Sequence, residues 1–199
     1  MPAAAPAPAR VPTPTATPRH AWLALRLPAL ALEVVAAGLA TPVAVLDGAG
    51  SRRLVVACNA EAARRGVRPG LAPPAARALV PDLETRERDP AAEERRLQSL
   101  ARWAVGFTPS VSPEPPDTLL LEVRGSLRLF GGAAALVQRA THELRALGHA
   151  VVPALAPTPR AALWLSRVAV RPSSRSIPSR GSPVRSRRCP SRAPAGRPP

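Results

Sequence analysis

The composition of the two ends leaves only the middle of this 199-residue chain able to fold around a hydrophobic core. Residues 1–19 are mostly proline, alanine and threonine with arginine, and residues 171–199 are almost wholly arginine, serine, proline, alanine and glycine, without a carboxylate. Neither end can bury enough apolar surface to offset the entropy of ordering, so both are predicted to be disordered. The folded unit is therefore expected to span residues 20 to 170.

The net charge of +15 favours a polyanionic partner such as DNA. All of the 28 basic residues other than histidine are arginine, and eight of them lie in residues 171–199. The absence of lysine, together with abundant alanine and proline, is also typical of a GC-rich coding sequence. Charge alone therefore leaves both explanations open.

The sequence predicts neither a membrane span nor a disulfide framework. No stretch of about 18 or more uninterrupted apolar residues occurs. The two cysteines, Cys58 and Cys189, suggest neither a set of disulfides nor a metal cluster. A reducing cytoplasm is the expected compartment. The alternative is that the acid-poor leader acts as a transit peptide.

The order of predicted elements favours a mixed α/β (α+β) fold. Residues 98–170 read as helix, strand, strand, helix, strand and helix, and the apolar segment 21–27 is predicted to be a strand of the same sheet. We expect helices packed on one face of this sheet. Residues 33–97 have their own strands and short helices, which predicts a small inserted subdomain.

Local signals place several elements within this outline. Three predicted helices begin after a residue that can cap them, namely Asn59, Asp89 and Thr158. The glycine-rich segment 47–50 is predicted to be a turn between the strands 42–47 and 53–58, in preference to a phosphate loop. The three tryptophans lie on apolar faces and are predicted to be core residues; they are Trp22, Trp103 and Trp164.

Three segments in order and spacing resemble the fingers and palm of Y-family translesion DNA polymerases. They are PVAVLDGAGSRRLVVACNAEAARRGVRPGL, TPSVSPEPPDTLLLEVRGSLRLFGG and ALAPTPRAALWLSR. The chain most resembles ImuB-type proteins, the catalytically degenerate branch that serves as a mutasome adaptor in bacteria. The resemblance implies a palm-like domain of residues 20–32 and 98–170, with a fingers-like subdomain of residues 33–97.

The resemblance also implies a two-metal site that this chain has mostly lost. Active family members carry two aspartates on the first strand and an Asp-Glu pair on the hairpin strand, which hold two Mg²⁺ ions. The matching positions here are Ala24, Arg26, Asp117 and Thr118, so Asp117 is the one carboxylate that remains. In active members two side chains of the fingers hold the triphosphate. The matching positions in this chain are Ala60 and Ala63.

These residues predict a DNA repair protein of the translesion type that associates with damaged DNA without transferring nucleotides. No cofactor or metal site is expected, and Mg²⁺ would be needed only by an active enzyme. Two alternatives stay open: an active error-prone polymerase with unexpected metal ligands, and a basic protein that binds nucleic acid through its tail. The candidate phosphate contacts are Arg52, Arg53, Arg64, Arg65, Arg68 and Arg77.

The resemblance implies further partners that this chain is not expected to reach. Full-length family members continue into a thumb and a little finger domain, and ImuB-type proteins bind mutasome partners and the sliding clamp through regions after the palm. The composition changes abruptly after residue 170, in the middle of the last predicted helix. We interpret residues 171–199 as an out-of-frame translation that leaves a truncated product.

Overall fold

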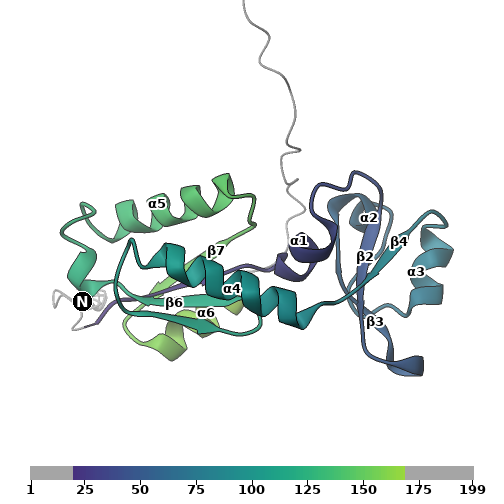
Figure 1. The fold of residues 1–199 in the computed structure, drawn as a ribbon, viewed down its shortest axis with the longest axis horizontal. Coiled ribbons are helices and arrows are strands. Elements are labelled where there is room, and N and C mark those ends of the chain that lie inside the picture. The colour runs from purple at the N-terminus through teal and green to yellow at the C-terminus, as the bar shows by residue number, and fades with distance from the viewer. Residues whose placement is uncertain (1–19, 169–199) are drawn as a thin grey trace, which may run out of the picture.

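Two β-sheets built from separate stretches of chain organise the computed structural model, which describes residues 20–168 (Figure 1). The predictions for the leader and for the tail lie outside the described residues. The two sheets lie side by side, and helix α1 (Leu30–Ala36) lies between them (Figure 1). Helix α4 (Pro90–Ala104) begins near this junction and runs along the larger sheet.

The larger sheet is antiparallel and has the strand order β5-β6-β1-β7. Its strands are β1 (Trp22–Arg26), β5 (Val111–Glu114), β6 (Thr118–Glu122) and β7 (Val152–Ala156). The predicted strand at 21–27 is thus confirmed as a central strand. Its side chains alternate between two apolar faces, because Leu23 and Leu25 belong to one buried cluster and Ala24 to another.

Helices cover both faces of this sheet. On one face α4 and α5 (Ala133–Ala146) pack against Leu23 and Leu25. On the other face α6 (Pro159–Val168) places Ala162 against Ala24, and Figure 1 shows it on the side of the sheet away from α5. The mixed α/β class is confirmed, but the expectation of helices on one face is wrong for α6. The central strands are apolar on both sides, so both sides need a cover.

The smaller sheet has the strand order β3-β2-β4. Its strands are β2 (Val43–Asp47), β3 (Leu54–Cys58) and β4 (Glu84–Glu87). The helices α2 (Ala60–Arg64) and α3 (Pro73–Leu79) cover one face, and α1 covers the other. Strand β4 pairs in parallel with β2 and was not predicted, because its sequence ETRE has no apolar alternation.

The predicted helix starts are confirmed by capping hydrogen bonds. The backbone N–H of Ala62 donates to Asn59 Oδ1 at 3.0 Å, and that of Ala92 donates to Asp89 Oδ1 at 2.9 Å. The predicted turn after β2 is also present, followed by the 3₁₀ helix η1 (Gly50–Arg52). Gly48 has φ +98°, and a Cβ there would lie 2.6 Å from the carbonyl oxygen of Arg52, so the turn requires glycine.

An arginine joins the smaller sheet to the long helix of the larger one. Arg88 follows β4 and donates from Nη1 to Asp47 Oδ2 at 2.8 Å. Its Nε and Nη2 donate to the two carboxylate oxygens of Glu93, each at 2.8 Å. Glu93 lies in the first turn of α4 and is only 3% exposed. The hydrogen bond from Arg88 also holds the pKa of Asp47 below its usual value.

A buried histidine ties α1 to the turn before β7. His149 Nδ1 lies 2.6 Å from Glu33 Oε2, and the backbone N–H of Ala150 donates to Glu33 Oε1 at 2.8 Å. The two partners are more than a hundred residues apart in sequence, and no local pattern assigned His149 this role. The contact fixes α1 against the larger sheet.

The three tryptophans differ in how far they are exposed. Trp22 and Trp103 are partly buried against the clusters of the larger sheet, as predicted. Trp164 is 66% exposed, so the prediction that it is a core residue is wrong. Within residues 20–168 no helix has the length and apolar character that crossing a membrane requires.

Candidate functional site

Asp117 lies directly before β6, beside the end of the central strand. The antiparallel register places Arg26, the last residue of β1, opposite Thr118. The backbone N–H of Leu27 donates to the carbonyl oxygen of Asp117 at 2.7 Å, which extends the pairing by one residue. The ladder therefore brings Arg26, Asp117 and Thr118 together at one end of the sheet.

Both carboxylate oxygens of Asp117 accept hydrogen bonds from these neighbours. Arg26 Nε donates to Oδ2 at 2.9 Å, and the hydroxyl of Thr118 donates to Oδ1 at 2.9 Å. Both side chains of the ion pair are partly buried. A partly buried, charge-assisted bond of this kind is stronger than a pair on the open surface. The negative charge of Asp117 is thus balanced by a guanidinium from the neighbouring strand.

The positions where the resemblance implies metal ligands do not form a carboxylate cluster. Ala24 is fully buried beneath α6 and offers no side-chain oxygen. Arg26 brings a positive charge to a position where a metal ligand would need a negative one. Among residues 20–168 no three His, Cys, Asp or Glu side chains gather closely enough to hold a metal ion. The donor set around Asp117 does not fit a pair of Mg²⁺ ions.

The six candidate DNA-binding arginines lie on elements of the smaller sheet, away from Asp117. Three of them are already engaged by carboxylates: Arg53 pairs with Glu87, Arg64 with Glu61 and Arg65 with Asp82. Arg65 donates two hydrogen bonds, at 2.9 and 2.5 Å, and these lower the pKa of Asp82.

The other three candidates keep their charge uncompensated within the described part of the chain. Arg52 and Arg68 are exposed and form no ion pair there. Arg77 is exposed on α3 and donates to the hydroxyl of Thr85 at 3.2 Å. These three guanidiniums are therefore the better placed of the six to meet a phosphate.

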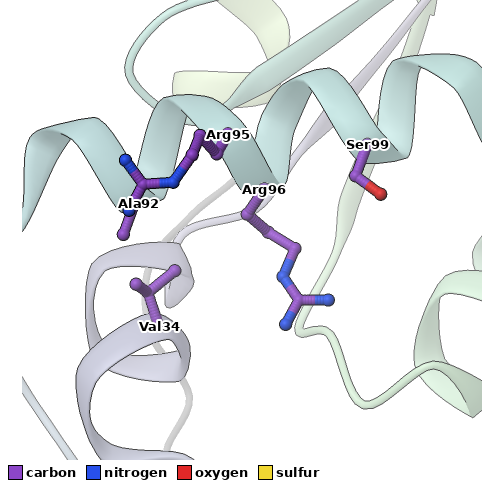
Figure 2. A pocket seen from close by; sticks show the side chains of 5 residues that line it. All are labelled: Val34, Ala92, Arg95, Arg96 and Ser99. Atoms are coloured by element: carbon purple, nitrogen blue, oxygen red, sulfur yellow. The ribbon is translucent and has the colours of Figure 1, made fainter.

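A shallow pocket of about 300 Å³ lies between α1 and α4. Figure 2 shows its lining, with Arg95 and Arg96 leaving α4 in different directions above Val34 of α1. Val34 packs against the cluster on the α4 side of the larger sheet. The pocket therefore belongs to the face opposite α6, and it does not include Asp117.

The sequence model of the impB/mucB/samB family matches residues 37–167. The chain belongs to this family. Protein ImuB of Caulobacter vibrioides is 39% identical to this chain over 102 residues, which is 51% of this chain and 22% of that protein. The chain thus spans less than a quarter of the length of the curated relative.

Solved structures confirm the fold that the family resemblance implies. The insertion ternary complex of Dbh DNA polymerase is similar with a TM-score of 0.61 and 17% identity, over 75% of this chain and 46% of that one. DinB from Sulfolobus solfataricus is similar with a TM-score of 0.59 and 15% identity, over 74% and 45%. The described part of this chain has the fold of the corresponding part of these polymerases.

The contact that defines this site was not predicted, although both of its residues had been singled out. The family resemblance assigns Arg26 and Asp117 to positions in the sequence and does not specify the distance between them in space. Pairing the strands 21–27 and 118–122 in an antiparallel register would have placed them together. The role of Arg88 was not predicted either. Its partner Asp47 ends β2 of the smaller sheet, and its partner Glu93 lies on α4, which packs on the larger sheet.

Proposed function

We propose that this chain is the palm and fingers part of a translesion DNA repair protein that associates with DNA and does not itself transfer nucleotides. One observation carries the proposal. The guanidinium of Arg26 and the hydroxyl of Thr118 each donate a hydrogen bond to one carboxylate oxygen of Asp117. The two-sheet arrangement supports a palm-like unit of residues 20–32 and 98–170 and a fingers-like unit of residues 33–97.

The electrostatics of the site support the absence of metal-dependent chemistry. Two metal ions about 4 Å apart in a phosphoryl-transfer site need several carboxylates to offset their charge. Here one carboxylate faces one guanidinium, so the local charge is already near zero. A divalent cation would have to displace Arg26 and would then meet a single acid.

The arginines of the fingers-like unit support the association with DNA. Arg52, Arg68 and Arg77 are exposed and held by no carboxylate within residues 20–168, and phosphate contacts of this kind position a protein on DNA without reading its sequence. The similarity to the ternary complex of Dbh DNA polymerase supports a place in DNA metabolism. The cytoplasm is the compartment that we propose for this activity. Mutasome proteins and the sliding clamp are proposed as partners of the longer relatives.

Primer extension tests the catalytic half of the proposal. The purified 199-residue chain, incubated with a primer-template and all four nucleoside triphosphates, is expected to add no nucleotide with Mg²⁺ or with Mn²⁺. Denaturing gel analysis of the labelled primer is the measurement. Extension that disappears in the Asp117→Asn variant would mean that the chain is an active polymerase, and the proposal would be rejected.

Salt-dependent DNA binding tests the other half. The double variant R52A/R68A is expected to lower the slope of log K against log salt by about 1.8 for duplex DNA, since each phosphate contact contributes about 0.9. The matched control is R64A/R65A, which removes two arginines already paired with Glu61 and Asp82 and is expected to change the slope less. If R52A/R68A has no effect and deletion of residues 171–199 removes the slope, the tail is the binding element.

A further inference from the structure

The exposed face of α6 is unusual for a helix that covers a sheet. Ala162 and Ser166, four residues apart, form the buried stripe, and both are small. The opposite side exposes 66% of Trp164 and 58% of Val168. Large aromatic side chains contribute strongly to interfaces, and Trp164, Leu165 and Val168 are exposed together on the second half of α6. The helix therefore carries an apolar patch that is open to a contact.

Two arginines share this face with the tryptophan. Arg160, Trp164 and Arg167 are spaced by four and then three residues, which places them on one stripe of an α-helix. The two arginines lie about 10 Å apart along the helix axis, one on either side of the indole. We call these three residues the α6 stripe.

The charge of the α6 stripe is uncompensated. The helix sequence PRAALWLSRV contains no carboxylate. Neither arginine forms an ion pair with another residue in the described range 20–168. Arg160 also stands in the first turn, where the helix dipole disfavours a positive charge, so helix stability does not explain it.

We propose that the α6 stripe binds single-stranded nucleic acid, with an unpaired base stacked on the indole of Trp164 and backbone phosphates held by Arg160 and Arg167. An exposed aromatic ring between two guanidiniums offers both interactions that non-specific single-strand binding uses, namely base stacking and charge attraction. The inference rests on the proposed association with DNA and adds a second contact surface on the larger sheet.

The charges favour this occupant over a second copy of the chain. Two copies joined face to face at Trp164 would bring four guanidiniums together without a carboxylate on either helix. A nucleic-acid backbone supplies the opposite charge. A duplex fits less well, because its bases already stack on one another and expose no ring face to a helix lying on the surface.

Binding of a short oligo(dT) to the full chain, followed by tryptophan fluorescence and anisotropy, tests the inference. The Trp164→Ala variant is expected to lose about 5-fold to 150-fold in affinity, and Trp164→Phe to lose less because it keeps a ring face. The R160A/R167A variant is expected to lower the salt slope by about 1.4, at 0.7 for each single-strand contact. Residues 169–199 are present in every variant, so their contribution cancels.

Arg102→Ala is the matched control, because Arg102 is an exposed arginine of α4, which packs on the opposite face of the sheet. It is expected to leave the affinity unchanged, and circular dichroism is expected to show the same fold in all variants. Unchanged oligo(dT) affinity in Trp164→Ala would overturn the inference. If R52A/R68A still weakened duplex binding, the proposed function would stand without it.

Two other results would also overturn the inference. Loss of self-association in Trp164→Ala, measured by sedimentation, with unchanged oligo(dT) affinity would make the α6 stripe an interface between copies. Absence of any binding of DNA by the unmodified chain would remove the inference together with the proposed function.

Discussion

Replacing Arg88 with alanine is expected to lower the free energy of unfolding by about 3 kcal/mol or more. Arg88 donates two hydrogen bonds to Glu93, which is 3% exposed, and a third to Asp47. Without Arg88 the carboxylate of Glu93 stays buried without a counter-charge, and the smaller sheet loses its link to α4. Chemical denaturation at neutral pH, monitored by circular dichroism, measures the effect.

Two further variants distinguish the loss of the hydrogen bonds from Arg88 to Asp47 and Glu93 from the loss of any arginine. Arg86→Ala, two residues earlier, breaks a surface ion pair with Glu84 and is expected to cost no more than about 1 kcal/mol. The R88M/E93M variant removes both charges and is expected to be more stable than Arg88→Ala, because no unpaired buried carboxylate is left. Equal losses for Arg88→Ala and Arg86→Ala would contradict this account of Glu93.

Converting the Arg26 contact into a carboxylate cluster is expected to create metal-dependent stability. In the R26D/T118E variant three acids would surround the position now neutralised by the guanidinium. Without metal their mutual repulsion is expected to lower the melting temperature. Mn²⁺ at a hundred times its dissociation constant is expected to restore about 2.7 kcal/mol of stability. Thermal melting over a Mn²⁺ series is the measurement.

Any effect of Mn²⁺ on the melting temperature of the unmodified chain is expected to be the same in the Asp117→Asn variant. The control R26D/D117N/T118E removes the central acid and is expected to lose the response to Mn²⁺. A melting temperature of the unmodified chain that rises with Mn²⁺, and no longer does so in Asp117→Asn, would show that this site binds metal as it stands. The proposed function would then be wrong in its catalytic half.

Most elements of the fold could be predicted because their signals are local. The apolar run at β1, the caps at Asn59 and Asp89 and the glycine turn after Asp47 each depend on neighbouring residues. Strand β4 has no such signal, since its four residues are mostly charged and it is held by pairing with β2. The side of the sheet that α6 covers is likewise a matter of packing, which the helical pattern does not specify.

Predicting the site was harder, because it depends on pairs distant in the chain. Asp117 and Arg26 were both identified as aligned positions, yet their 2.9 Å contact follows only from the register of β1 and β6. Trp164 was misplaced because small residues, Ala162 and Ser166, occupy the buried stripe and let α6 approach the sheet closely. Large apolar residues are usually buried. On α6 the close contact between the helix and the sheet leaves room only for small side chains, so Trp164 lies on the exposed side.

The bond between Arg26 and Asp117 also bears on how such a protein can evolve. A single mutation of Arg26 to an acid would set two like charges beside each other, and a single loss of Asp117 would strand a partly buried guanidinium. Each single step from this pair toward a set of carboxylates is thus less stable than the starting point. Selection for stability alone would disfavour the gain of a metal site at this position.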